Sequence, residues 1–262
     1  MTTPAASLDS AAAPAKPAAL WEDLIDIFTS PGAVFRRRRD GRFWLAMLVF
    51  TVVGALTFVV ARPSMQPMLD RQVAAQQAKI DANPNIPAEQ REAARNQVRN
   101  IVDSPFTMIA PALYLPISLF AAGLTLWLVA KLFGSGASLG QAVAVASIAG
   151  IPRVLLGLAS VGGSVVLGRQ LEFAHQLTLG PGTVVGEVSP VVSALLQRLD
   201  LGVLWQTVLL GLGIAVMGRL TRRGGEQVVE GEISRGKGLA AAAVVWALAT
   251  AMTIVNTINQ AG

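Results

Sequence analysis

The sequence FWLAMLVFTVVGALTFVVA, residues 43–61, follows directly after a basic segment, RRRRDGR, at residues 36–42. A helix of about 20 apolar residues matches the roughly 30 Å hydrocarbon core of a lipid bilayer. Arginines that immediately precede such a span mark its cytoplasmic end. The sequence therefore predicts an integral membrane protein whose N-terminus lies in the cytoplasm.

The composition of the 262 residues agrees with this class. Hydrophobic residues make up 53% of the chain and charged residues only 14%, with a mean hydropathy of +0.54, which is too apolar for an ordinary soluble domain. The net charge of +5 comes from basic residues that flank the apolar segments. We therefore assign them to membrane topology and anionic lipid, and we expect no nucleic-acid partner. The chain has no cysteine, which excludes disulfides and thiolate chemistry.

Four further apolar segments follow, at residues 106–130, 139–167, 201–217 and 239–255. Together with residues 43–61 they predict an all-α fold, a polytopic membrane protein with a bundle of five transmembrane helices. Residues 1–19 are rich in Ala, Pro, Ser and Thr and are predicted to form a disordered tail. Residues 20–258 are predicted to form the membrane domain.

Alternating five spans from a cytoplasmic start places the C-terminus outside. The inside segments (1–42, 131–138 and 218–238) then hold 12 Lys and Arg residues. The outside segments hold 8, with Arg153 counted apart. The basic excess agrees with the proposed orientation.

Two outside segments are long enough to have structure of their own. Residues 62–105 predict a helical hairpin between spans one and two, because helical patterns flank turn-forming residues at 81–87. The hairpin is either a solvated connector, which we favour, or a surface for docking a partner. Residues 168–200 are predicted to form an outer loop.

The segment at residues 20–28, LWEDLIDIF, is amphipathic. Its apolar face holds Leu20, Leu24, Ile27 and Phe28, and its other face holds Glu22, Asp23 and Asp26. The pattern favours a helix in the cytoplasmic interface, although such helices usually carry Lys or Arg on their polar face. Docking on the protein's own spans therefore remains an equal alternative.

Arg153 is the one ionisable residue within an apolar stretch, and such a residue is a functional candidate by default. In the interpretation we favour, the third span begins near Pro152, residues 139–150 are re-entrant or interfacial, and Arg153 reaches cytoplasmic headgroups. In the alternative, one kinked helix places Arg153 near the midplane, paired with a carbonyl, a lipid phosphate or a partner.

The sequence offers two sets of candidate contact residues. The candidates for lipid or partner contact are Arg36, Arg37, Arg38, Arg39 and Arg153. The candidates for helix packing are Ser160, Ser164, Gly168 and Gly211, because small residues four apart let helices approach closely.

Catalytic chemistry is poorly represented. A loose metal site could be drawn from Glu172, His175 and Glu187, but we favour a solvated loop histidine. Ser164 follows two glycines, a pattern similar to that of an intramembrane serine nucleophile. Such a nucleophile needs a base on another helix, and the sequence offers none. No Asp or Glu lies within the apolar cores, which argues against a coupled transporter acting alone. We expect no enzyme activity, cofactor or metal.

Three motifs point to a family. Ser30-Pro31-Gly32-Ala33-Val34-Phe35 precedes the basic segment, Ile148-Ala149-Gly150-Ile151-Pro152 lies in span three, and Leu199-Asp200-Leu201-Gly202-Val203-Leu204-Trp205 opens span four. This order resembles the Yip domain family, named for eukaryotic proteins that interact with Rab GTPases, and in particular its bacterial members. The resemblance covers roughly residues 20–258.

The resemblance implies five membrane helices, a cytoplasmic N-terminus and a bacterial inner membrane. Eukaryotic members of the family are non-enzymatic adaptors in vesicle traffic, and bacterial members lack Rab partners. Our hypothesis is thus a non-enzymatic membrane adaptor or assembly factor that contacts the bilayer, other membrane proteins or its own copies. The alternative is a membrane subunit of a transport or export complex.

Overall fold

The computed structural model describes residues 20–223 and 226–261. The predicted tail at residues 1–19 lies outside the described residues. The helices are α1 (Leu20–Thr29), α2 (Pro31–Arg37), α3 (Trp44–Ala82), α4 (Ala88–Asp103), α5 (Phe106–Leu132), α6 (Leu139–Val166), α7 (Pro190–Arg198), α8 (Leu201–Ala215) and α9 (Arg235–Ala261). Two short 3-10 turns, Ala174–Leu177 and Pro181–Val184, precede α7. Strands β1 (Arg219–Arg223) and β2 (Glu226–Glu230) lie between α8 and α9.

Four helices in the described residues are long and apolar enough to cross a membrane: α3, α5, α6 and α9. A fifth passage is formed if α7 and α8, which meet at a bend of 51°, count as one broken span. The 15 residues of α8 extend only about 22 Å at 1.5 Å per residue, which is too short to cross the hydrocarbon core alone. The prediction of a helical multi-pass membrane protein is confirmed, with four or five spans.

Helix α6 is the centre of the bundle. In its most apolar stretch 61% of the residues are buried, compared with 28% or less in the other three spans. Its first half is the most enclosed, since Ala142 to Ala146 are all fully buried. These small side chains allow close approach of α5, where a Cβ on Gly123 would lie 2.6 Å from the Val143 Cα. Helices α3, α5 and α8 pack around α6.

The favoured interpretation of residues 139–150 is wrong. They are not a separate re-entrant piece, because α6 runs unbroken from Leu139 to Val166 with Pro152 inside it. The N-terminus of α6 is fixed by a capping box, in which Ser138 and Gln141 each bond the other's backbone N–H. Tight packing of this half against its neighbours outweighs the local cost of the proline.

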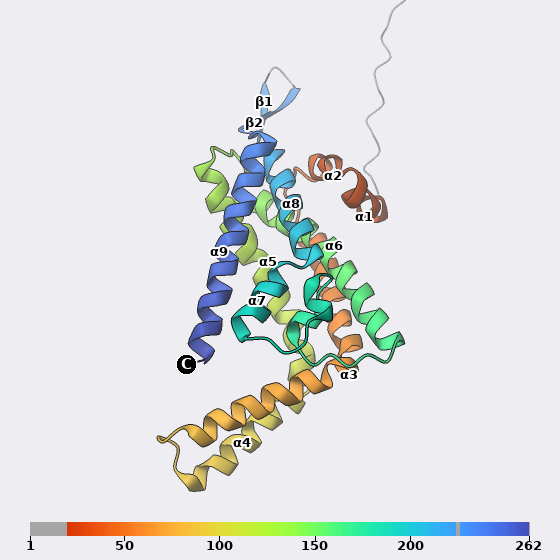
Figure 1. Ribbon diagram of the computed structural model, residues 1–262. Coiled ribbons are helices and arrows are strands. Elements are labelled where there is room, and N and C mark those ends of the chain that lie inside the picture. The colour runs from red at the N-terminus through yellow and green to blue at the C-terminus, as the bar shows by residue number, and fades with distance from the viewer. Residues whose placement is uncertain (1–19, 224–225, 262) are drawn as a thin grey trace, which may run out of the picture.

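Figure 1 shows α1, α2 and the β-hairpin at one end of the bundle and the C-terminus at the other. We call these the N-end and the C-end. The 133–138 turn belongs to the N-end, because Gly136 N–H donates to the Gly231 carbonyl at 2.8 Å, just past β2. The arm, defined as residues 62–103 of α3 and α4, projects at the C-end (Figure 1).

The β-hairpin is an exception to the all-α prediction. Its strands pair antiparallel from Arg219↔Glu230 to Arg223↔Glu226, so basic residues on β1 face acidic residues on β2 at both ends. Close contact anchors its base to the 133–138 turn, since a Cβ on Gly136 would lie 2.8 Å from the Glu230 carbonyl oxygen. The inside segment predicted at residues 218–238 therefore contains a pair of antiparallel strands, 219–223 and 226–230.

Candidate functional site

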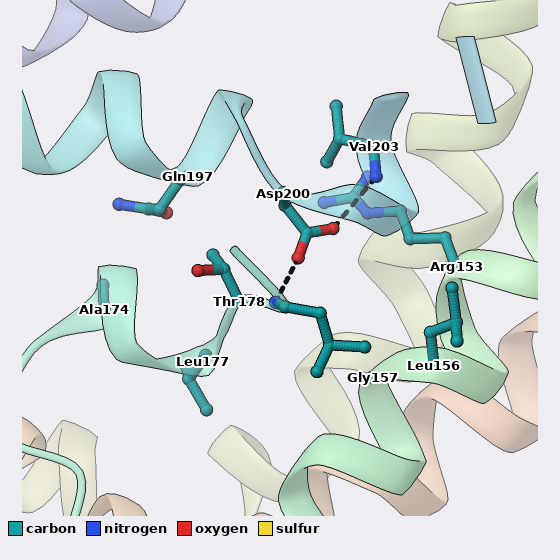
Figure 2. Close-up of a pocket in the computed structure, with 10 residues that line it drawn as sticks. Arg153, Leu156, Gly157, Ala174, Leu177, Thr178, Gln197, Asp200 and Val203 are labelled. Carbon is teal, nitrogen blue, oxygen red and sulfur yellow. Dashed lines mark hydrogen bonds between the residues drawn. The ribbon is translucent and has the colours of Figure 1, made fainter. Parts of the chain in front are cut away.

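The break between α7 and α8 contains a cavity of about 250 Å³ (Figure 2). It lies between α6, the turns that follow α6, and the start of α8. Its lining consists of Arg153, Leu156, Gly157, Ala174, Leu177, Thr178, Leu179, Gln197, Asp200 and Val203. The predicted outer loop at 168–200 thus contains α7 and packs against the spans. Irregular backbone is tolerated in membrane proteins where it lines a cavity, and the turns before α7 line this one.

Asp200 is the residue that organises the break. One of its carboxylate oxygens accepts the Val203 N–H at 2.9 Å and so caps the N-terminus of α8. The other accepts the Leu179 N–H at 2.6 Å (Figure 2). A backbone bond from Leu201 N–H to the Leu179 carbonyl, at 3.0 Å, completes the junction. Asp200 therefore fixes the loop against the start of α8.

Arg153 extends into this cavity from midway along α6 (Figure 2). Its side chain donates to Gln206 Oε1 at a long 3.4 Å. Gly202 makes room for it, since a Cβ there would lie 3.2 Å from Arg153 Cγ. Arg153 lies midway along an unbroken α6, so the third span does not begin near Pro152 as the favoured interpretation held. An unpaired charge at the bilayer centre costs about 2.5–3.5 kcal/mol on insertion scales, so its surroundings carry functional information.

Arg198 ends α7 beside the same break. Its guanidinium donates to the Ala249 carbonyl and to Thr253 Oγ1 of α9, both at 2.8 Å. These partners are neutral, so Arg198 links α7 to α9 without its charge being cancelled there. The break holds two arginines and one aspartate and is electropositive.

His175 is not the solvated loop residue that the sequence predicted. Its side chain is 1% exposed. Nε2 lies 3.1 Å from the carbonyls of Val185 and Gly186, and Nδ1 lies 2.9 Å from Ser193 Oγ. The bond to two carbonyls requires a proton on Nε2, which leaves Nδ1 to accept from the Ser193 hydroxyl in the neutral ring.

This histidine joins the loop to α7. The bonding places a serine beside the one histidine, a pair that the sequence did not suggest, and the serine is Ser193 and not Ser164. Glu172 is engaged elsewhere, in an ion pair with Arg71 at 2.6 Å. The described residues contain no group of three His, Asp or Glu side chains that could hold a metal ion.

At the N-end, the basic segment is engaged largely by the protein itself. Asp23 accepts from Arg37 Nη2 at 2.7 Å and from Arg38 Nη2 at 2.6 Å, and Asp26 accepts from Arg37 at 2.7 Å. Hydrogen bonding to Asp23 raises the pKa of Arg37 above its ordinary value, although burial opposes this shift. The acidic face of α1 is therefore explained by docking against α2. Arg36 is exposed and stacks over Gly32.

Arg39 and Gln141 join three elements of the N-end. Arg39 Nε donates to the Val216 carbonyl at 2.9 Å, and its guanidinium also pairs with Glu232. The Gln141 side chain is buried and donates to the carbonyls of Arg39 at 2.8 Å and Gly218 at 2.9 Å. These bonds connect the basic segment, the start of α6 and the β-hairpin.

A family model described as the Yip1 domain matches residues 25–256, which covers both of these regions. The chain belongs to the Yip1 domain family. Members of this family are multi-pass membrane proteins that are not known as enzymes. Comparisons with curated proteins and with solved structures gave no match.

The small residues of this Yip1-domain chain have different roles. Gly211 lies at the contact of α8 with α9, where a Cβ would be 2.8 Å from the Leu239 Cα. Ser164 is buried and donates to the Ser160 carbonyl within α6. Gly168 does not pack helices: it is exposed beyond the end of α6, with φ of 62° and open space around it. That left-handed conformation suits a glycine that terminates a helix.

Sequence reasoning missed the most informative polar residues of the Yip1 domain. Gln141 and Gln206 were not singled out, Asp23 was noted only on the polar face of residues 20–28, and Asp200 was noted only in a motif. Two signals were available: an aspartate directly before an apolar run predicts a helix N-cap, and Ser138 with Gln141 has the spacing of a capping box.

Replacing Asp23 by asparagine is expected to release α1 from α2. The change keeps the shape of the side chain but removes the charge that two arginines share, and Asp23 is only 8% exposed. Limited chymotrypsin digestion of detergent-solubilised protein should then cut near Trp21 and Phe28 several-fold faster. Asp40→Asn is the control, since Asp40 pairs only with exposed Arg42. Equal digestion of both variants would contradict this assignment.

Proposed function

We propose that this protein is a non-enzymatic adaptor or assembly factor of the bacterial inner membrane, which binds another membrane protein through its arm. Its Yip1 domain and its apolar spans support the membrane role. The observation that carries the adaptor role is the arm itself. It is a polar structure that extends beyond the bundle and contains no residue arrangement for catalysis.

The arm is built to hold a fixed shape. Helix α4 packs back along α3, and Arg95 pairs with Asp81 across the turn at 2.5 Å. At its base, Arg62 donates to Thr107 Oγ1 at 3.2 Å and to the Val102 carbonyl at 3.3 Å. The Arg71–Glu172 ion pair ties α3 to the segment after α6. A connector that only had to join two spans would need none of these contacts.

The outer face of α4 offers a surface for a partner. No residue of α4 is buried. A shallow groove of about 360 Å³ runs along it, lined by Ala93, Asn96, Gln97, Asn100, Ile101, Ser104 and Phe106. Ile101 and Phe106 are 57% and 61% exposed among amide side chains. Exposed apolar side chains surrounded by polar ones are typical of protein–protein contacts.

Crosslinking tests the adaptor proposal. A photoreactive amino acid at Gln97 should give one discrete adduct with another membrane protein in intact cells, and the same probe at Ala78 on α3 should give none. Ile101→Glu should abolish both the adduct and recovery of the partner in a pull-down, whereas Ala78→Glu should preserve them. Failure of Gln97 to give any adduct above the Ala78 background would refute docking on this face.

The orientation that we propose places the N-end in the cytoplasm and the C-end, with the arm, outside. The basic segment at 36–42 and the basic β1 strand share the N-end, which supports this orientation. Because the chain has no cysteine, single cysteines can be introduced without background. In intact spheroplasts, a membrane-impermeant maleimide should label Asn85→Cys, Glu187→Cys and Asn259→Cys, but Arg222→Cys only after lysis. Labelling of Asn259→Cys only after lysis would mean that α7 and α8 do not complete a span.

A second candidate function is that of a membrane subunit in a transport or export complex. The broken α7–α8 helix and its cavity favour it, because transporters form substrate sites at interrupted helices. Stoichiometric recovery of an ATPase or exporter with the Gln97 probe would support this alternative. Recovery of a partner with neither activity would support the adaptor.

A further inference from the structure

The Arg153 guanidinium has more hydrogen-bonding capacity than the protein uses. A guanidinium carries five N–H donors. In the described part of the chain its side chain makes one hydrogen bond, to Gln206 Oε1, and no ion pair with a carboxylate. The residue is exposed although it lies midway along the central helix. Its free donors therefore lie within reach of the cavity at the α7–α8 break.

Asp200 attracts Arg153 electrostatically, but the two residues form no ion pair in the described part of the chain. The Asp200 oxygens instead accept the backbone N–H groups of Val203 and Leu179. Arg198 repels Arg153, and among the described residues its guanidinium donates to neutral groups of α9. The three charged groups leave the break with a surplus positive charge, which an anion in the cavity would balance.

We propose that this cavity binds a phosphate group, held by the planar fork of Arg153. Arginine presents a planar fork of N–H donors that matches phosphate oxygens bidentately. A volume of about 250 Å³ accommodates a phosphate with its nearest substituents, but not a whole lipid. Gln197 and Thr178 add polar atoms to the lining, and Leu156, Leu177 and Val203 supply apolar ones. The phosphate belongs either to a phospholipid headgroup or to a soluble phosphate compound.

Two independent changes test the site. Arg153→Gln removes the charge and keeps a polar side chain. Gly157→Leu leaves Arg153 in place and fills the cavity, because Gly157 lines it and a Cβ there meets no atom within 4 Å. The matched controls are Arg42→Gln, an exposed arginine outside the cavity, and Gly162→Leu, an equally unobstructed glycine of α6 that does not line the cavity.

The experiment uses the full chain in detergent with two probes. Phosphatidylglycerol is titrated and counted by native mass spectrometry, and inorganic phosphate is titrated with thermal unfolding as the readout. We expect one saturable site in the wild-type chain whose Kd rises at least about tenfold, or 1.4 kcal/mol, in Arg153→Gln and in Gly157→Leu. Both controls should keep the wild-type Kd. The Kd of Arg153→Lys should lie between those of the wild-type chain and Arg153→Gln, because lysine keeps the charge but lacks the planar fork of donors.

The two probes identify the source of the phosphate. Saturable binding of phosphatidylglycerol alone assigns the site to a lipid headgroup, and stabilisation by inorganic phosphate assigns it to a soluble compound. If Arg153→Gln does not fold, Gly157→Leu decides the question. A Gly157→Leu chain that binds both probes with the wild-type Kd, or a wild-type chain that binds neither saturably, overturns the proposal.

Discussion

Replacing Gly238 by alanine is expected to destabilise the bundle, although the same change in an ordinary helix is stabilising. Alanine is favoured over glycine by about 1 kcal/mol inside a helix. Here a Cβ on Gly238 would overlap the Gly211 carbonyl oxygen and lie 2.9 Å from the Ala215 Cβ. Backbone and short side chains cannot move aside as a flexible side chain can, so α9 must shift away from α8. Overpacking of this kind costs about 1–3 kcal/mol, and more when backbone must move.

The measurement is thermal unfolding of detergent-solubilised protein, followed by size-exclusion chromatography of the heated sample. We expect Gly238→Ala to unfold several degrees below the wild-type chain, and Gly238→Leu not to assemble. Gly162→Ala is the matched control, since no atom lies within 4 Å of the Cβ built on Gly162. It should be neutral or slightly stabilising. A Gly238→Ala chain as stable as this control would show that α8 and α9 are not in close contact.

The presence and approximate positions of the apolar spans could be predicted from the sequence, because hydropathy over about 20 residues reports directly on the cost of burial in lipid. The break at α7–α8 could not be predicted in this way. Hydropathy treats Leu201–Met217 as a clean span, whereas α8 ends at Ala215 and needs α7 to reach across. Whether a short apolar helix is completed by another segment depends on tertiary contacts such as the Leu179–Asp200 junction.

The candidate site was only partly predictable for a related reason. Arg153 stands out because a charge in an apolar stretch is rare. Its local sequence with Pro152 suggested a helix start at a membrane interface. The structure keeps one helix because Ala142, Ala144 and Ala146 are fully buried and α6 packs against α3, α5 and α8, and this gain depends on residues far away in the chain. Partners that lie 14 or 102 residues apart, such as Asp23 with Arg37 or Gln141 with Arg39, leave no periodic signal.

Replacing Gln141 by leucine is expected to destabilise the N-end. The Gln141 amide donates to the carbonyls of Arg39 and Gly218, and its oxygen accepts the Ser138 N–H at 2.9 Å. Leucine has a similar volume but satisfies none of these groups, and each buried polar group left unpaired costs about 1–3 kcal/mol. The bond to Gly218 is buried and the other two are part-buried, so we expect a loss of about 1–3 kcal/mol.

A second variant, Gln141→Glu, separates the contribution of hydrogen bonding from that of side-chain packing. Gln141→Glu can still accept from the Ser138 N–H, but its second oxygen would face the two carbonyls that the amide now serves, so it should be as unstable as Gln141→Leu. Gln90→Leu, on the exposed surface of α4, is the control and should unfold at the wild-type temperature. The same thermal assay measures all three. If Gln141→Leu matched the control, the basic segment and the β-hairpin would be held to α6 by apolar contacts alone. The expected loss instead makes one buried amide the link between the basic segment and the helix that carries Arg153.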